Sequence, residues 1–97
     1  MTKCETAICQ LAVNVYGKTS QCTVCMEEMA ELTKELPKNL RGQDNAAHIA
    51  EEIADVEIML EQLKLMFSIR DEVTQQRTVK LQRLDNRISQ SLIHPKP

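Results

Sequence analysis

The sequence predicts an all-α protein of four helices with a central antiparallel helix hairpin. Only two glycines and three prolines occur in 97 residues, and two of the prolines stand within the last three positions. Such scarce turn-forming residues leave little room for β-hairpins. Helix-favouring residues (Leu, Glu, Gln, Met, Ala and Lys) dominate the remainder. A chain of this length forms one small domain, expected over residues 1–97.

The first helix is expected over residues 2–15, where apolar side chains recur on one face. Gly17 marks its end, because glycine readily follows the last helical turn. The second helix is expected to open after Thr19 or Ser20. Either hydroxyl can accept a hydrogen bond from a free backbone N–H of the first turn.

Pro37 is expected to stop or kink the second helix, because a proline disfavours helical geometry at the residue before it. The third helix is expected to begin behind Asp44 or Asn45, both good N-caps, and to run to about Phe67. The fourth is expected over 71–92, and the few residues after it are expected to fray.

The second and third helices each carry a narrow apolar stripe at the spacing of a helix that packs on a partner. The connection between them is short, so the two helices are expected to form an antiparallel hairpin. The stripes are Cys25, Met29, Leu32 and Leu36 in one helix, and Ile49, Ile53, Val56, Leu60, Leu63 and Phe67 in the other.

Two pairs of acids flank these stripes at matching positions. Glu28 and Glu31 bear the same offset to the first residue of their stripe as Glu52 and Asp55 bear to theirs. In an antiparallel hairpin, matching flanks converge. Residues at one height also have sequence numbers with a constant sum, and Glu28 with Asp55 adds to the same total as Glu31 with Glu52. Four carboxylates are therefore expected to meet at one level on one side of the hairpin.

Converging carboxylates repel one another, by roughly 0.2–0.5 kcal/mol per pair along a helix. A divalent cation removes that cost, and oxygen ligands without histidine or thiolate suit Mg²⁺, with Mn²⁺ also possible. Open coordination positions would take phosphate oxygens, and the metal could lower the pKa of an attacking water. The alternative, a solvated acidic helix face without a metal, stays open at this point.

Two short segments resemble the paired metal-binding motifs of the MazG-like nucleotide pyrophosphohydrolases, in which E-x-x-E is followed by E-x-x-D. They are EEMAEL at residues 27–32 and EEIADV at residues 51–56, and twenty residues separate Glu31 from Glu52, within the range usual for that family. The longer run HIAEEIADVEIMLEQLKLMF is similar to phage-type and Gram-positive members. The resemblance spans roughly residues 11–88.

The resemblance implies an all-α fold in which Glu28, Glu31, Glu52 and Asp55 hold Mg²⁺ against a nucleoside triphosphate. Attack by an activated water would release pyrophosphate and leave the nucleoside monophosphate, a reaction suited to nucleotide pool control. Members of the family are commonly dimers or tetramers. A second apolar face on the third helix, which includes Ala54, Ile58 and Leu65, independently favours a homodimer or homotetramer.

A basic stripe is expected on the fourth helix, where Lys80, Arg83 and Arg87 recur at helical spacing. The family often shows such a repeat there, which implies binding of the triphosphate and of the leaving pyrophosphate. The alternative is a solvated face whose charges pair with neighbouring acids.

Charge and hydropathy exclude several classes of protein. The net charge of −2 argues against a nucleic-acid-binding protein, and no apolar run approaches the ~20 residues of a membrane span. No signal-peptide pattern opens the chain, so a cytoplasmic location is expected. There, the four cysteines are expected to be reduced and not to bind metal, since Cys4 and Cys9 lack the spacing of a zinc site.

Two other functions are compatible with acids gathered from facing helices. A di-iron carboxylate bundle requires Glu-x-x-His pairs, and no glutamate has a histidine three positions later. A catalytically inactive helical interaction module on the same scaffold remains the main alternative to an enzyme, because ligands alone do not establish turnover.

Overall fold

The computed structural model describes residues 1–93, so the tail expected to fray lies mostly outside the described part of the chain. Within it the protein has four α-helices and no strand, which confirms the all-α prediction. The helices are α1 (Lys3–Tyr16), α2 (Lys18–Leu40), α3 (Ala46–Met66) and α4 (Arg70–Ile93).

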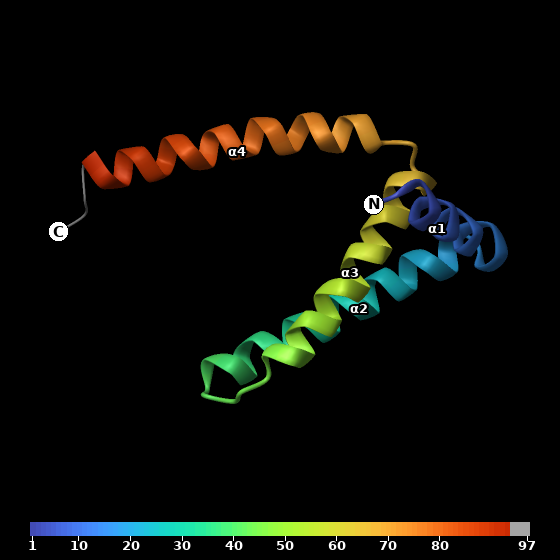
Figure 1. The fold of residues 1–97 in the computed structure, drawn as a ribbon, viewed down its shortest axis with the longest axis horizontal. Coiled ribbons are helices and arrows are strands. Elements are labelled where there is room, and N and C mark those ends of the chain that lie inside the picture. Colours follow the sequence, from blue (N-terminus) through green and yellow to red (C-terminus); the bar gives the residue numbers. More distant parts are fainter. Residues whose placement is uncertain (94–97) are drawn as a thin grey trace.

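The helices form an open V (Figure 1). One arm is the antiparallel hairpin of α2 and α3, with α1 packed across its base, and the other arm is α4, which contacts only α3. The radius of gyration is 17.2 Å, whereas a compact domain of this length would have about 12–13 Å. The single chain is therefore far from compact.

The start of α1 is held by a reciprocal cap between Thr2 and Glu5. The Glu5 N–H donates to the Thr2 hydroxyl at 3.1 Å, and the Thr2 N–H donates to the Glu5 carboxylate at 2.8 Å. At the other end, Gly17 has φ +90°, a conformation that glycine adopts without steric cost. This residue turns the chain from α1 into α2.

The predicted start of α2 was wrong, and the helix does not stop at Pro37. The helix begins at Lys18, so neither Thr19 nor Ser20 is its N-cap; the Gly17 carbonyl already accepts from the Gln21 N–H at 3.1 Å. At its far end α2 continues through Pro37 to Leu40. The proline removes a single N–H near the helix end, and its carbonyl still accepts from Arg41, so the last turn persists.

The hairpin closes along a seam of residues spaced alternately four and three apart, as in a coiled coil. Its members are buried or half-buried: Gln21, Cys25, Glu28, Leu32 and Glu35 from α2, the N-cap residue Asn45, and Ile49, Glu52, Val56 and Met59 from α3. The seam is rotated toward the acids relative to the predicted stripes. The side-chain amide of Gln21 donates to that of Gln62 at 2.7 Å in its buried part. Polar side chains thus form part of an interface that was expected to be apolar.

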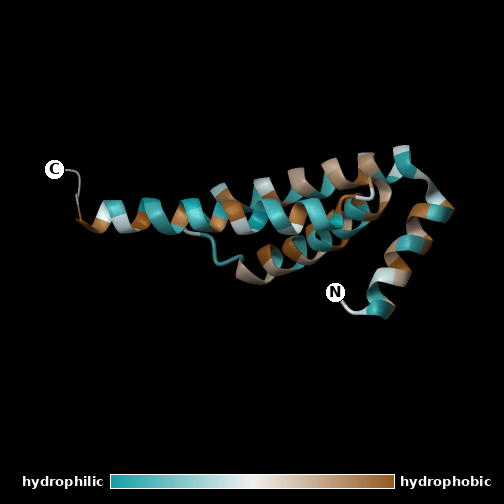
Figure 2. Cartoon of the chain, turned by 90° about the horizontal axis from the view of Figure 1, so that it is seen from above, coloured by the Kyte–Doolittle hydropathy of each residue, from teal (hydrophilic) through white to brown (hydrophobic). Residues whose placement is uncertain are grey.

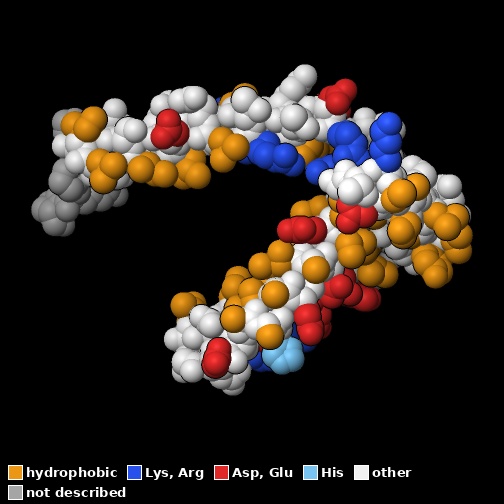
Figure 3. All heavy atoms as spheres, in the orientation of Figure 1, with side chains coloured by type: hydrophobic (Ala, Val, Ile, Leu, Met, Phe, Trp, Pro, Cys, Tyr) orange, Lys and Arg blue, Asp and Glu red, His pale blue; other side chains and the backbone are white. Residues whose placement is uncertain are grey.

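This rotation leaves six of the ten predicted stripe residues outside the seam, and four of those six lie along one side of the hairpin. Met29, Leu36, Ile53 and Leu60 are 41–48% exposed and lie on the side opposite to Glu31 and Asp55. We call these four residues the apolar edge, and we call Glu28, Glu31, Glu52 and Asp55 the acidic edge. In Figure 3, the side of the hairpin that carries the apolar edge faces α4, and the acidic side chains lie mainly on the opposite side.

The corner between α3 and α4 is fixed by an ion pair and by backbone hydrogen bonds. Arg70, the first residue of α4, pairs with the buried carboxylate of Glu61 on α3. Ser68 has φ +54°, the Ile69 N–H donates to the Lys64 carbonyl at 3.1 Å, and the Ser68 N–H donates to the Leu65 carbonyl. These bonds hold α4 away from the hairpin.

The fourth helix, α4, has no buried residue, and its apolar side chains recur as separate bands along a mainly polar helix (Figure 2). None of the helices within residues 1–93 combines the length and the hydropathy needed to cross a membrane.

Candidate metal centre

Three carboxylates meet where α2 and α3 pack together. Glu28 comes from α2, and Glu52 and Asp55 come from successive turns of α3. Each offers one oxygen, and these three oxygens lie within 4.8 Å of one another. The antiparallel geometry of the hairpin produces this convergence, because Glu28 and Glu52 are both seam residues and Asp55 stands one turn from Glu52. The convergence expected from spacing is therefore present for three of the four predicted acids.

The burial of Glu52 distinguishes this cluster from a solvated acidic face. Glu28 and Glu52 are half-buried and Asp55 is exposed. The Oε2 atom of Glu52 is inaccessible to solvent and has no hydrogen-bond partner in the protein. A buried carboxylate oxygen without a donor is costly, so this atom calls for a cation or a proton.

The negative charges of the cluster are unfavourable in the folded protein, as the raised pKa values of two of its carboxyl groups indicate. Burial raises the pKa of Glu28 above its ordinary value, and the neighbouring charges of Asp55 and Glu52 raise it further. Burial likewise raises the pKa of Glu52, and so do Asp55 and Glu31. Within residues 1–93, no lysine, arginine or histidine forms an ion pair with Glu28, Glu52 or Asp55. The cluster therefore carries uncompensated negative charge.

The fourth predicted ligand, Glu31, is on the same edge but is not in the cluster. Its carboxylate pairs with Lys34 at 3.3 Å, and both side chains are more than half exposed. Its charge still acts on the pKa values of Glu28 and Glu52. An exposed ion pair of this kind contributes little, so Glu31 can leave Lys34 at small cost.

Glu35 extends the row of acids, and sequence reasoning missed it. Burial alone would raise its pKa, but hydrogen bonds from Lys38 and Asn45 outweigh that effect and the pKa is lowered. The Asn45 amide also donates to the Glu35 carbonyl at 2.9 Å. The signal was the four-and-three spacing of Cys25, Glu28, Leu32 and Glu35, which places two glutamates in the seam. Glu35 is neutralised by its partners, unlike Glu28 and Glu52.

The donor set fits a hard divalent cation. Three carboxylate groups supply oxygen only, which suits Mg²⁺ or Mn²⁺ better than a metal that prefers nitrogen or sulfur. The exposed side of the cluster, at Asp55, would leave coordination positions open for water or phosphate oxygens.

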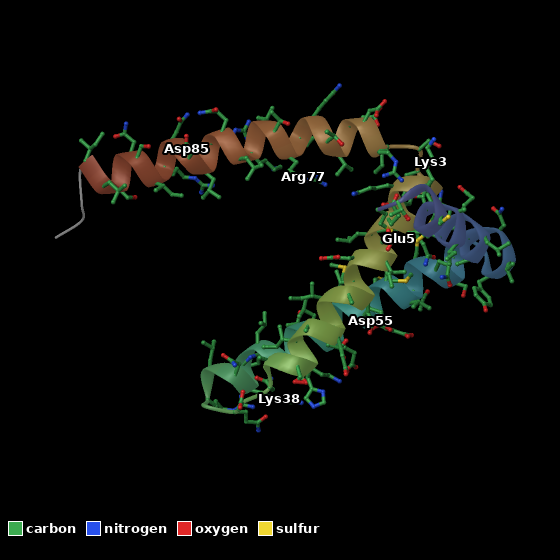
Figure 4. The ribbon with its side chains drawn as sticks, viewed as in Figure 1. Lys3, Glu5, Lys38, Asp55, Arg77 and Asp85 are labelled. Carbon is green, nitrogen blue, oxygen red and sulfur yellow. The ribbon has the colours of Figure 1, made fainter. Side chains whose placement is uncertain are left out.

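The basic stripe does not reach this cluster within one chain. Lys80, Arg83 and Arg87 all lie on α4, which packs only against α3 near the corner. In Figure 4, Asp55 lies on the side of the hairpin away from α4, whereas Arg77 lies on the side of α4 that faces the hairpin. The structure therefore separates the predicted phosphate-binding residues from the predicted metal ligands.

All four cysteines are free, as expected for the reduced state. Cys9 and Cys25 are buried, and this burial is the main reason that the pKa of both thiols is raised. Cys22 is half-buried and Cys4 is exposed. The Cys9 thiol donates to the carbonyl of Ile58, which ties α1 to α3. Buried cysteine here behaves as a small packing residue.

Comparisons of the chain with protein-family models, with curated proteins and with solved structures found no match.

Proposed function

We propose that this protein is a magnesium-dependent nucleoside triphosphate pyrophosphohydrolase of the MazG-like kind. It would convert a nucleoside or deoxynucleoside triphosphate to the monophosphate and pyrophosphate, in the service of nucleotide pool control in the cytoplasm. The observation that carries the proposal is the meeting of Glu28, Glu52 and Asp55, with a buried Glu52 oxygen that has no donor. The motif resemblance selects this reaction from those that carboxylate-bound magnesium supports.

In the proposed mechanism, Glu28, Glu52 and Asp55 would hold the cation, and Glu31 would be a fourth ligand once its side chain has left Lys34. When bound, Mg²⁺ would neutralise phosphate charge and lower the pKa of an attacking water. The water oxygen would be added to the α-phosphorus as the α–β phosphoanhydride bond breaks, pyrophosphate would leave, and the proton of the water would pass to solvent. The exposed side of the cluster, at Asp55, would leave room for the phosphate group beside the residues that hold the cation.

Lys80, Arg83 and Arg87 are proposed to bind the triphosphate through charge-assisted hydrogen bonds. Since α4 does not reach the acidic edge of its own chain, these residues would come from another copy whose α4 lies beside that edge, as two associated dimers in a homotetramer would allow. Replacing Arg83 by glutamine should then raise KM for the triphosphate with little change in magnesium affinity.

The experiment is a product assay with each common nucleoside triphosphate and Mg²⁺, followed by chromatographic separation. Pyrophosphate and monophosphate are expected from the wild type. Glu52→Gln should abolish turnover and weaken Mg²⁺ binding by roughly tenfold or more. Glu51→Gln, the same chemical change at the exposed neighbouring residue, should leave both unchanged.

Two results would overturn the proposal in different ways. Release of orthophosphate in place of pyrophosphate would rule out a pyrophosphohydrolase. Absence of turnover with every nucleotide would favour the catalytically inactive interaction module, which the separation of the basic stripe from the acids also favours.

A further inference from the structure

Two apolar surfaces of this chain face each other across the open V without meeting. One is the apolar edge of the hairpin, Met29, Leu36, Ile53 and Leu60. The other is a groove along α4, and its lining includes Ile69, Val73, Leu81 and Leu84. Figure 3 shows hydrophobic side chains on both inner sides of the V. A soluble monomer rarely leaves matched apolar surfaces of this extent uncovered.

The corner prevents α4 from closing onto its own hairpin. The connection is short, and it is held by the Glu61–Arg70 pair and by the backbone bonds at Ser68 and Ile69. Glu61 is only 4% exposed, so moving Arg70 away would leave a buried carboxylate without a partner. The surface that covers the apolar edge must therefore come from another molecule.

The α4 helix of a second copy matches the apolar edge in length, spacing and charge. At 1.5 Å per residue, α4 is about 36 Å long and α3 about 32 Å. Leu81 and Ile88 are seven residues apart, and so are Ile53 and Leu60. Arg77 lines the α4 groove, while Glu57 lies between Ile53 and Leu60 on α3, which supplies opposite charges to the two surfaces.

We infer that two copies clasp each other, with α4 of each lying in the V of its partner along the apolar edge. The arrangement is two-fold symmetric, so each copy gives one α4 and receives one. Two helix-on-hairpin contacts of this length are on the scale of the interfaces of stable complexes, which bury about 1,200–2,000 Å² in total. The acidic edge stays uncovered in the clasped pair, so the metal ligands keep their access to solvent and to α4 of a further copy. The inference rests on shape and surface and does not depend on the proposed catalytic activity.

The test is the mass in solution of the full chain, measured by light scattering after size-exclusion chromatography across a series of concentrations. The wild type is expected at twice the 11.1 kDa of one chain, or at four times that mass where two clasped pairs associate. Leu84→Glu, which places a charge in the α4 groove, should raise the dissociation constant at least ~100-fold. Gln75→Glu, on the exposed opposite side of α4, should leave the mass unchanged. Circular dichroism on each variant verifies that helix content is kept.

A mixing experiment separates this arrangement from other dimers. Ile53→Glu damages the receiving surface and Leu84→Glu damages the inserted helix, so each variant alone should be monomeric. When the two are mixed, one α4–hairpin contact per pair is wild type, and heterodimers should form. A wild type that stays monomeric, or a mixture that stays monomeric although the wild type dimerises, would overturn the inference. Because the readout is mass and not turnover, its failure leaves the proposed enzyme activity standing.

Discussion

The Oε2 atom of Glu52 is the residue-scale feature with the widest consequences. A carboxylate in the seam of two helices would ordinarily be replaced by an apolar side chain, because burial disfavours its charge. Here burial and neighbouring acids together raise the pKa values of Glu28 and Glu52. The folded protein without metal therefore pays a cost that a divalent cation would remove.

This cost predicts a pH dependence of stability. A carboxyl whose pKa is raised by folding contributes stability that is present below its unfolded pKa and is lost as pH rises through the raised folded value. The metal-free protein should therefore become more stable on acidification from about pH 7 to about pH 5. Excess Mg²⁺ should stabilise the protein at neutral pH and flatten this dependence. Urea unfolding at both pH values, with and without Mg²⁺, measures it.

The double variant Glu28→Gln, Glu52→Gln is the matched control, since it removes both raised groups and keeps side-chain volume. It should show neither the gain on acidification nor the response to Mg²⁺. Below the ordinary carboxyl pKa the sign reverses, because Glu5 and Glu35 have lowered pKa values and their stabilisation is lost as pH falls. If the free energy of unfolding of the wild type falls steadily as pH is lowered from neutral, the charges of Glu28 and Glu52 do not destabilise the folded protein.

Sequence spacing was sufficient to predict the three-acid cluster, because backbone periodicity alone decides which side of an antiparallel hairpin two residues share. The position of the Glu31 carboxylate was not predictable in the same way. Glu31 stands on the correct edge, but its exposed side chain adopts a conformation that reaches Lys34. The side-chain conformation of Glu31 depends on its rotamer and on nearby charged residues, and helical spacing does not determine either.

At the scale of elements, the hairpin was predicted and its seam was not. Apolar spacing favoured Met29 and Leu36 as core residues, yet the helices pack through Gln21 and Glu28 instead. A buried amide pair fits there because each amide satisfies the other, and counting apolar residues cannot reveal that. Pro37 shows a similar limit, since a proline near a helix end costs only one hydrogen bond.

The amide pair of the seam can be tested by a double-mutant cycle. Gln62→Leu alone leaves the buried Gln21 amide without its partner and should cost about 1–3 kcal/mol. The double change Gln21→Leu, Gln62→Leu should be nearly neutral or stabilising, because both polar groups are removed. Chemical denaturation of the four proteins gives the coupling. Additive losses would show that the two amides do not depend on each other.

The corner between α3 and α4 makes a second prediction at this scale. Arg70→Ala should destabilise the protein by about 1–3 kcal/mol, because the Glu61 carboxylate stays buried without its donor. Lys34→Ala breaks an ion pair between two exposed side chains and should change stability by less than about 0.5 kcal/mol. Urea denaturation under identical conditions compares the two. An equally small effect of Arg70→Ala would mean that the corner does not hold α4.

At the scale of the whole molecule, the hydrophobic core is too small for a self-sufficient domain. Among the hydrophobic residues of 1–93, only Cys9, Cys25 and Met59 are buried. The amphipathic pattern of the helices was legible in the sequence, but the V was not. The shape depends on a positive φ at Ser68 and on one ion pair, neither of which leaves a periodic signal.

A chain that completes its core with a second copy must have a stability that depends on concentration. By mass action, each tenfold increase in protein concentration favours the folded dimer by about 1.4 kcal/mol over unfolded chains. For a dimer of this size the unfolding midpoint should then rise by about 3–6 °C per decade. Differential scanning calorimetry on serial dilutions of the wild type measures this slope. Leu84→Glu should unfold at a lower temperature with a midpoint independent of concentration, because it no longer unfolds from a dimer. A concentration-independent midpoint in the wild type would instead mean that the exposed apolar surfaces of α4 and the hairpin are stable in water within a single chain.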